Sequence, residues 1–588
     1  MNKLKKIMGI VLVLAIVSSI AVVFAGCNPI VLDPEDEGKF QLKISAYEAG
    51  YGTEWLINYK TAFEQAYADY THPDYPEKEG VQISIDWNQN ASTEILAKLA
   101  LDTIENHLYF NSVNPYDLAA SGDAYNLTSI LQADMAEVGE TGKTLEGKIE
   151  TDYQNYLKAF DGKYYAMPMF ETYEGLQYNI DLFERKGFYF VKDSVYYEAG
   201  PTPEEQRAYA ESRFTTGLSG AKEKAEGPDG VANTLDDGLP ATHAEFWELC
   251  DYMVASSVTP FVWSGVWKNY ANMLPKALWI NEEGIEQMRL HFTFNGQAKT
   301  LVDVDEDGNV TPYNGGEPVT INDNNAYLLQ KQEGLYRALQ FAKKMTSNPD
   351  YYDSESLGGT LTHTGAQDKF ITNELLGGKP IAFLPEGTYW QAEAVGTFNA
   401  NAQQYGDVYG YEQNRYGFMP LPTYDGKVGH KNTIMSGANI CFADGQISGY
   451  EVELVQSFLQ FISTDAQLYE FLKLTHYSRA MKMTLNSDQY NSLSSYAKSM
   501  YNVRSNSDIV YTFSENQFFL YYSGTSFSWS MNRDGWIFNY SSTYQLPIQD
   551  MKNDTSGTLT PEEYFNGCYS RLQAKWDQLY TDYWYPAT

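Results

Sequence analysis

The segment 227–238 carries a dense grouping of side chains suited to metal binding. It reads Gly-Pro-Asp-Gly-Val-Ala-Asn-Thr-Leu-Asp-Asp-Gly, with oxygen-bearing side chains set between glycines. Because Ca²⁺ takes several oxygen ligands from a flexible turn, we expect a calcium site made by Asp229, Asn233, Asp236 and Asp237. The alternative is a series of Asx turns, in which the same oxygens accept hydrogen bonds from nearby backbone N–H groups.

A second acidic group, Asp303, Asp305 and Asp307 followed by Gly308, has the spacing of the start of an EF-hand loop. The twelfth position of such a loop is a glutamate that binds calcium through both oxygens, but here it is Asn314. The flanking residues also have the pattern of strands. We therefore expect a β-hairpin with an Asp-Gly turn at this place.

Catalytic motifs are incomplete throughout the chain. Gly142-Lys143-Thr144 resembles the end of a phosphate-binding loop, but Glu137 occupies the position of its first glycine. The seven histidines are scattered without zinc-ligand spacing, and no Gly-x-Ser-x-Gly sequence occurs. Carboxylate pairs carry no information without geometry, because the chain has 76 Asp and Glu residues. These observations indicate a protein that is not an enzyme.

Aromatic residues offer a different kind of chemistry. Trp263 and Trp267 flank Ser264-Gly265 directly after a strand-like run, so two indoles four residues apart could form a stacking platform. Packing in the core is the equal alternative. The chain also has 48 tyrosines. Tyrosine joins an apolar face to a hydroxyl group and so suits the C–H faces and hydroxyls of sugars, which favours a carbohydrate ligand modestly.

The N-terminus has the order of a secretory signal. Lys3, Lys5 and Lys6 precede an apolar run over 7–24, and small residues then lead to Cys27. The sequence Phe-Ala-Gly-Cys that ends at Cys27 resembles a bacterial lipobox, which implies cleavage before Cys27 and lipidation of its thiol. The mature protein would then be anchored by lipid to the outer face of the cell membrane. The alternatives are an ordinary signal peptide or a single membrane anchor.

Composition narrows the class of protein further. The chain has 588 residues and a formal net charge of −35, so it suits two large lobes rather than one core, and its surface repels nucleic acid. Beyond the N-terminus, no apolar stretch approaches the ~20 residues of a spanning helix. Besides Cys27 there are Cys250, Cys441 and Cys568. They do not form a disulfide framework, and we expect Cys250 and Cys441 to be buried, inert thiols.

Hydrophobic periodicity predicts alternating strands and helices from about residue 40 onward. The first five elements are strand, helix, strand, helix and strand, at 40–46, 54–70, 81–87, 93–107 and 115–120. This order predicts a parallel sheet with helices on both faces. Further strands are predicted at 174–179, 259–264, 380–384, 416–421 and 439–442, and further helices at 181–186, 244–255, 450–462 and 561 to about 580.

Several of these elements carry a family resemblance. The run 161–168, Asp-Gly-Lys-Tyr-Tyr-Ala-Met-Pro, followed by Gly-Leu-Gln-Tyr-Asn-Ile-Asp-Leu-Phe at 175–183, resembles a signature of the bacterial extracellular solute-binding proteins of family 1. This is the maltodextrin-binding-like group that serves ATP-binding-cassette (ABC) sugar importers. The segments 239–247, 370–390 and 420–462 are similar to three further blocks of that family, in the same order. Together the resemblance covers roughly residues 40–480.

The resemblance implies an α/β fold of the type II periplasmic-binding-protein kind, with a ligand cleft between two lobes joined by crossing strands. After a signal peptide at 1–26 and a tether at 27–39, we expect lobe 1 at 40–170 plus 435–485, and lobe 2 at 171–434 plus 486–588. The chain departs from the family through insertions at 188–238 and 280–360 and an extended segment after 485.

Candidate ligand-binding residues lie at strand ends and in segments that border the cleft in the family. They are Glu48, Tyr51, Trp87, Asn90, Thr172, Tyr173, Trp263, Trp267, Glu386, Trp390 and Ser436. Each has a structural alternative: a glycine turn or loop for the first four, hinge structure for Thr172 and Tyr173, and core packing for the tryptophans of lobe 2.

The resemblance implies capture of a carbohydrate, with an oligosaccharide as the expected ligand, and its delivery to the permease subunits of an ABC transporter. The protein would act outside the cell or in the periplasm, without a cofactor other than the calcium ion considered above. Two other classes remain open: a surface glycoside hydrolase, and a sensory or peptide-binding receptor of the same fold.

Overall fold

The computed structural model describes residues 34–584, apart from 48–49, 51, 102, 114, 160, 199, 216–221, 428–429, 512–542 and 545. The predictions for Cys27, Glu48 and Tyr51 therefore lie outside the described residues. No helix within the described ranges is both long enough and apolar enough to cross a membrane.

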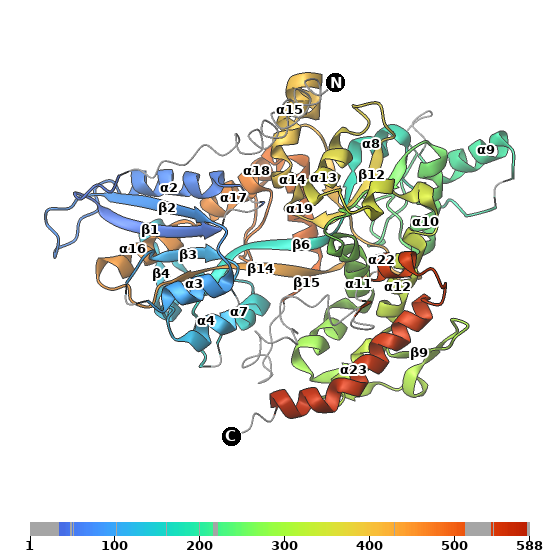
Figure 1. The fold of residues 1–588 in the computed structure, drawn as a ribbon. Helices are drawn as coiled ribbons and strands as arrows, with labels where there is room; N and C mark the ends of the chain where they lie inside the picture. The colour runs from blue at the N-terminus through green and yellow to red at the C-terminus, as the bar shows by residue number, and fades with distance from the viewer. Residues whose placement is uncertain are drawn as a thin grey trace, which may run out of the picture.

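The chain folds into two lobes, seen at the left and right of Figure 1. In lobe 1, β1 is parallel to both β2 and β3. The side chains of β1 are buried on both faces, as expected for a parallel strand covered by helices. The elements of this lobe are β1 (Phe40–Tyr47), α2 (Glu54–Ala66), β2 (Val81–Asn88), α3 (Ser92–Leu99), β3 (Leu108–Asn111), α4 (Pro115–Ser121), α5 (Thr128–Gln132), β4 (Asp134–Met135), β5 (Glu140–Thr144), α6 (Leu145–Lys148), α7 (Thr151–Leu157), α16 (Tyr450–Phe461) and α17 (Asp465–Thr475).

Two sequence predictions for this lobe need correction. The strand expected at 115–120 is the helix α4, and the third strand of the sheet lies earlier, at β3. Pro115 stands at the first position of α4 and Asp117 in its first turn, and both residue types favour a helix start. The helix expected over 93–107 ends early, because α3 stops at Leu99.

Two long strands cross between the lobes. They are β6 (Met167–Asn179) and β14 (Thr433–Ala443), which pair antiparallel to each other. At one end β14 also pairs with β3 of lobe 1, and β6 continues into lobe 2 to pair with β12 (Ile381–Gly387) and β13 (Tyr416–Phe418). A register shift interrupts the β6–β14 pairing between Asn439 and Ile440. One continuous sheet therefore links both lobes.

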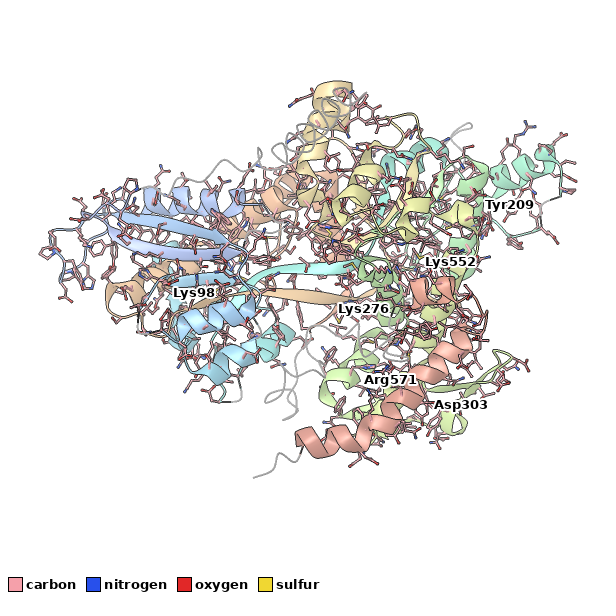
Figure 2. All side chains as sticks on the ribbon, in the orientation of Figure 1. Lys98, Tyr209, Lys276, Asp303, Lys552 and Arg571 are labelled. Atoms are coloured by element: carbon pink, nitrogen blue, oxygen red, sulfur yellow. The ribbon has the colours of Figure 1, made fainter. Side chains whose placement is uncertain are left out.

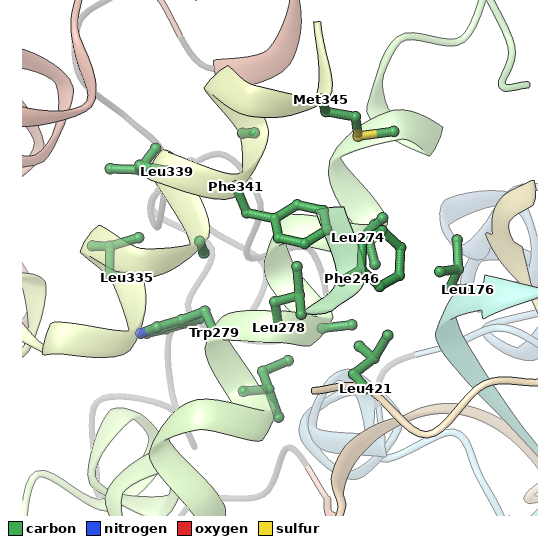
Figure 3. Close-up of a cluster of buried hydrophobic side chains, with 14 of the residues drawn as sticks. Leu176, Phe246, Leu274, Leu278, Trp279, Leu335, Leu339, Phe341, Met345 and Leu421 are labelled. Carbon is green, nitrogen blue, oxygen red and sulfur yellow. The ribbon is translucent and has the colours of Figure 1, made fainter. Parts of the chain in front are cut away.

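Lobe 2 is larger, and its core surrounds α11 (Asn269–Thr293), a long helix with a kink at Gly284. Leu274, Leu278 and Trp279 of α11 face Leu335 and Phe341 of α12 (Glu333–Met345) in this core (Figure 3). The elements are α8 (Ile180–Lys186), α9 (Pro203–Arg213), α10 (His243–Ala255), β7 (Thr259–Phe261), α11 (Asn269–Thr293), β8 (Gly296–Ala298), β9 (Val302–Val304), β10 (Val310–Pro312), β11 (Val319–Ile321), α12 (Glu333–Met345), α13 (His363–Thr372), α14 (Trp390–Glu393) and α15 (Val395–Tyr405).

The segment after residue 485 is built into both the crossing sheet and lobe 2. Its strand β15 (Asp508–Val510) pairs with β14, and its helix α19 (Ser495–Asn506) packs on β13. α18 (Ser487–Ser492) precedes α19. At the C-terminal end, α22 (Pro547–Asn553) and α23 (Pro561–Trp584) pack on α12. The N–H of Glu563 bonds the Thr560 hydroxyl at 3.2 Å, as expected from the helix-start signal at this place.

The second insertion contains the predicted hairpin. Strands β9 and β10 pair antiparallel around a turn in which Gly308 has a positive φ.

The three cysteines Cys250, Cys441 and Cys568 are buried and free. Burial raises the pKa of the Cys441 thiol to about 12, so it stays protonated at neutral pH.

Candidate functional site

A small pocket lined by both polar and apolar side chains lies where the two lobes meet. Its walls come from the crossing strands β6 and β14, from the helix α11 and from Tyr389 just after β12. Thr172 of β6 and Ser436 of β14 both line it, so the structure brings two of the predicted residues together. The pocket encloses about 80 Å³, which is room for a few water molecules. We call it the interlobe pocket.

One ion pair crosses this pocket. Lys276 of α11, which is only 5% exposed, pairs with Glu174 of β6. Figure 2 labels Lys276 close to the ends of β6 and β14 that enter lobe 2. The sequence pattern did not indicate Lys276. Most residues of α11 are buried, so the helix has no clear division into a polar and an apolar face that would mark a buried lysine as unusual. Its ammonium group supplies hydrogen-bond donors at the junction of the lobes.

Two further carboxyl groups lie at the lobe 2 side of the junction. Glu386, a predicted site residue, is 1% exposed and accepts a hydrogen bond from the N–H of Gly387 at 2.9 Å. Burial and then the charge of Glu393 raise the pKa of Glu386, and burial also raises that of Glu393. Gln367 donates to Glu393 at 2.7 Å. A carboxyl group with a raised pKa holds its proton more readily and can then donate a hydrogen bond.

The loop after β1 reaches across to this carboxyl cluster. A Cβ atom placed on Gly50 would lie 2.4 Å from Oε1 of Glu393, so a larger residue here would require the Glu393 side chain to move. The carbonyl of Gly50 also accepts a hydrogen bond from the Tyr477 hydroxyl at 3.4 Å. Gly50, which follows β1 of lobe 1, therefore contacts Glu393 of α14 in lobe 2.

Trp390 and Trp263 are core residues, and the expectation that they face the cleft is corrected here. Both are 0% exposed. The ring of Trp390 packs against those of Phe370 and Tyr416, and its Nε1 donates to the Tyr496 hydroxyl at 3.2 Å. Trp263 packs against Tyr352. The Trp390 ring therefore has its packing contacts and its hydrogen-bond partner on its own side of the lobe junction.

Four other predicted site residues lie at separate places outside the interlobe pocket. Trp267 is 54% exposed just before α11, so it does not share a platform with the buried Trp263. Trp87, at the end of β2, is partly buried against the lobe 1 core, and Asn90 is also partly buried, in the loop that follows. Tyr173 is buried and donates its hydroxyl to Glu171 at 2.8 Å. Of this group, none lines the interlobe pocket.

The crossing strand β6 also carries a buried ionic network, which we call the hinge network. Glu171 is 1% exposed and accepts hydrogen bonds from Tyr173, from Nε of Arg504 at 2.6 Å and from the Tyr511 hydroxyl. Arg504 also bonds Glu150 of lobe 1 at 3.1 Å. Because Arg504 and Tyr511 belong to the segment after 485, the resemblance gave no indication of this network.

The predicted calcium loop uses its carboxylates locally. Asp236 accepts hydrogen bonds from the N–H of Asp229 at 2.9 Å and from the Thr234 hydroxyl at 2.5 Å. Asp237 accepts one from the N–H of Asn233 at 2.8 Å. Among the described residues, no group of three or more His, Cys, Asp or Glu is arranged to hold a metal ion. These hydrogen bonds are those of the Asx-turn alternative.

Comparison with known proteins establishes the fold. No protein-family model matches the chain, and no curated protein matches its sequence. Among solved structures, apo RafE from Streptococcus pneumoniae is 11% identical, with 92% of this chain and 99% of that chain covered and a TM-score of 0.51. A structure from work on xylan utilization by the thermophilic bacterium Caldanaerobius polysaccharolyticus is 14% identical, with 91% and 100% covered and a TM-score of 0.50.

A structure of SBP RafE in complex with raffinose is 11% identical, with 91% of this chain and 99% of that chain covered and a TM-score of 0.49. At these identities the likeness concerns the fold. The two-lobed α/β fold with crossing strands, which the family resemblance implied, is thus confirmed, and this chain shares that fold with RafE.

Proposed function

We propose that this chain is an extracellular binding protein that captures a carbohydrate between its lobes and delivers it to the permease subunits of an ABC transporter. The observation that carries the proposal is the interlobe pocket, whose walls come from both crossing strands and from lobe 2 and combine apolar side chains with polar ones. Its fold is that of RafE, and RafE has been solved in complex with raffinose.

Ligand entry requires the lobes to move apart. The interlobe pocket encloses about 80 Å³, whereas small-molecule sites usually hold about 300–1,000 Å³. Gly50 of lobe 1 also lies against the Glu393 side chain of lobe 2, so the lobes are in contact in this structure. Binding then proceeds by hinge opening and by closure around the sugar, and the closed form is the one that a transporter can distinguish from the empty protein.

Calorimetric titration with a panel of oligosaccharides tests this proposal. The panel includes raffinose, maltose, mannobiose and chitin oligosaccharides. We expect at least one to bind, and Lys276→Gln to weaken that binding by about tenfold or more, because a charged hydrogen-bond donor is lost from a buried pocket. The control is Lys299→Gln, since Lys299 is 58% exposed on the surface of lobe 2. Equal affinity in Lys276→Gln and the control would contradict the site.

Surface glycoside hydrolysis is the second candidate function. One observation favours it: Glu386 and Glu393 are two neighbouring carboxyls with raised pKa values, the condition in which a carboxylic acid can act as a general acid. A reducing-sugar assay on the same panel separates the two functions. We expect no sugar release. Release that disappears in Glu386→Gln would make the protein a hydrolase instead.

We further propose that lipid on Cys27 anchors the protein to the membrane. The support is the lipobox-like sequence that follows the apolar run. Cys27→Ser should block processing and alter partition into detergent relative to the unsubstituted protein. A Cys27→Ser variant that is processed and partitions in the same way would rule out this anchor.

A further inference from the structure

A second, much larger hollow lies at the far end of lobe 2. It encloses about 960 Å³ between the helix α9 of the first insertion and the helix α10. We call it the outer groove. Tyr209 of α9, which lines it, and Lys276 of the interlobe pocket are labelled in Figure 2 at well-separated places. Figure 1 shows α9 standing at the outer right edge of the molecule. The outer groove is therefore not part of the interlobe pocket.

Both helices that form the outer groove are fixed at their starts. α9 begins with a capping box between Thr202 and Glu205, and α10 begins with one between Thr242 and Glu245. A capping box satisfies two backbone N–H groups that a helix start leaves without partners. The groove walls are thus regular helices with defined ends.

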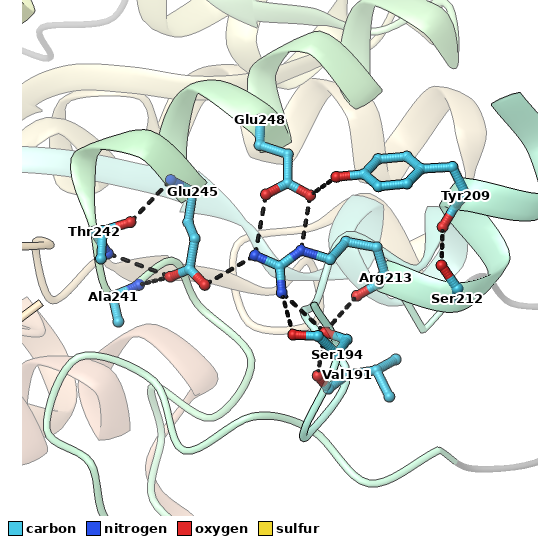
Figure 4. A network of polar contacts seen from close by, with 9 residues as sticks. All are labelled: Val191, Ser194, Tyr209, Ser212, Arg213, Ala241, Thr242, Glu245 and Glu248. Carbon is cyan, nitrogen blue, oxygen red and sulfur yellow. Dashed lines mark hydrogen bonds and ion pairs between the residues drawn. The ribbon is translucent and has the colours of Figure 1, made fainter. Parts of the chain in front are cut away.

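A buried arginine joins the two walls (Figure 4). Arg213, the last residue of α9, is 5% exposed and bonds Glu248 of α10 at 2.8 Å and Glu245 at 3.0 Å. The Tyr209 hydroxyl donates to the same Glu248. The guanidinium of Arg213 also lies over the ring of Phe190, 4.6 Å from its centroid. This network holds α9 at a fixed separation from α10, so the groove is a built feature of the fold.

Aromatic rings are concentrated on the rim of the groove. Tyr196 is 64% exposed and Tyr197 is 46% exposed, and both make edge-to-face contacts with Tyr209. Exposing large rings in water is unfavourable unless they meet a partner. Because the rings contact Tyr209 through edge-to-face geometry, each retains surface that can stack on a ligand.

The charges around the groove restrict the ligand. Arg213 is neutralised by Glu245 and Glu248, and Arg207 lies 3.8 Å from Glu211. Among the described residues that line the groove, positive charges do not outnumber negative ones, and the whole chain has a net charge of −35. An anionic ligand or an anionic membrane surface would be repelled. A neutral molecule with apolar C–H faces and many hydroxyls would match aromatic faces beside fixed carboxylates.

We propose that the outer groove binds a neutral saccharide chain, as a second carbohydrate site separate from the interlobe pocket. Tyr196 and Tyr197 stack on sugar rings, and groove side chains such as Gln206 bond their hydroxyls. The volume of about 960 Å³ is at the upper end of the usual range for small-molecule sites, which suits a chain of several sugar units. Such a site would hold a long polysaccharide at the protein surface while the interlobe pocket takes a short oligosaccharide.

Affinity electrophoresis of the purified full-length chain tests this proposal. Native gels contain soluble xylan, soluble starch or glycol chitin. We expect one of these polymers to slow the protein, and the double variant Tyr196→Ala/Tyr197→Ala to lose at least about tenfold in apparent affinity, on the scale known for stacking on aromatic rings. The matched control removes two exposed tyrosines elsewhere, Tyr75→Ala/Tyr424→Ala, and should migrate like the unsubstituted protein.

Two further variants keep the test decisive. Ala255→Arg places a bulky side chain into the groove from the exposed last residue of α10, where a positive charge suits the helix end. It should abolish retardation without disturbing the Arg213 network. Lys276→Gln should leave retardation unchanged, which separates this proposal from the interlobe site. Retardation by none of the three polymers, or equal retardation of the double variant, would overturn the proposal.

Discussion

The hinge network and the Arg213 network use the same chemistry for different purposes. In each, a buried arginine bonds two carboxylates and a tyrosine hydroxyl shares one of them. The partners differ in origin. Arg504 and Glu171 are 333 residues apart in sequence, whereas Arg213 and Glu248 are 35 apart. The first network ties the C-terminal segment to a strand that crosses both lobes, and the second ties an insertion to its neighbouring helix.

This difference has an energetic consequence. Breaking a buried ion pair leaves an unpaired charge away from water, and that cost depends on how completely the remaining group is buried. Glu171 is 1% exposed, whereas the side chains of Glu245 and Glu248 beside Arg213 are 27% and 9% exposed. Damage to the hinge network should therefore destabilise the whole molecule, and damage to the Arg213 network should act mainly on α9 and the outer groove.

The largest effect is expected from Trp390→Ala at the lobe junction. Trp390 is 0% exposed and packs beside the helix α19 that carries Arg504. Removing a fully buried tryptophan costs about 3–5 kcal/mol of unfolding free energy. Denaturant titration measures it, with the 54% exposed Trp267→Ala as control, for which we expect about 0.5 kcal/mol or less. Similar small losses in both variants would place Trp390 at a surface.

Glu171→Gln should cost about 2–3 kcal/mol, because the amide keeps the shape of the side chain but loses its charged hydrogen bonds to Arg504. Denaturant unfolding of the full chain measures the loss, and sugar affinity is recorded on the same variant. The matched variant Glu374→Gln removes an exposed carboxylate that pairs with Arg185 and should change stability little. An unaffected Glu171→Gln would mean that the hinge network does not connect the lobes energetically.

Acid should weaken the junction through His476. Its ring bonds Gln391 of lobe 2 at 2.8 Å and Ser494 at 3.0 Å, and burial lowers its pKa to about 3. The unfolded chain takes up this proton near pH 6.5, so the contribution is fully present above that pH and is lost as pH falls toward 3. Between pH 6.5 and about pH 5 the loss is on the order of 2 kcal/mol.

Melting curves over this pH range check the prediction, with His476→Asn as the comparison. Asparagine tolerates the positive φ of 63° at this position. His107 and His243 also have lowered pKa values, about 4 and about 3, so only part of the acid sensitivity should disappear. Identical pH profiles in the two proteins would show that protonation of His476 does not contribute to the loss of stability in acid.

Arg213→Met should have a smaller effect, about 1–2 kcal/mol, since the apolar stem can still cover Phe190 while two partly exposed carboxylates are released. The loss should be local. Limited proteolysis should cut near α9 sooner than in the unsubstituted protein, while the affinity for oligosaccharide stays the same. A matched loss of interlobe affinity would show that the insertion is coupled to the lobe junction.

Calcium should have no effect on either region. Asp229, Asp236 and Asp237 already bond the groups of their own turn, so neither calcium nor a chelator should shift the melting temperature. A rise with calcium that is lost in Asp236→Asn would restore the metal site that the sequence pattern suggested.

Local patterns in the sequence determined the order of elements well. Strand alternation at 40–46 and 81–87 corresponds to β1 and β2, and the Asp-Gly turn near 308 corresponds to the β9–β10 hairpin. These features depend on neighbours within a few residues, so the chain itself specifies them. The error at 115–120 arose because a short apolar run has no clear period and suits a strand or a helix equally.

The family resemblance indicated where two lobes would meet, and the structure brought Thr172 and Ser436 together at that place. Which aromatic side chains would face the cleft was a different question. Trp390 and Trp267 are both tryptophans in loop or helix-start segments, yet one is 0% and the other 54% exposed. Exposure depends on the neighbours that packing supplies, and for Trp390 these include Tyr496, which lies 106 residues further along the chain.

The local sequence pattern therefore determined most of the alternating elements, and the family resemblance implied the strands that cross between the lobes. Only the tertiary structure decided the partners of Glu171, the burial of Lys276 and the groove beside α9. Periodicity and turn chemistry act over a few residues, whereas a buried ion pair or a groove forms only when distant segments pack together. The free energy of each such contact depends on how much water that packing removes.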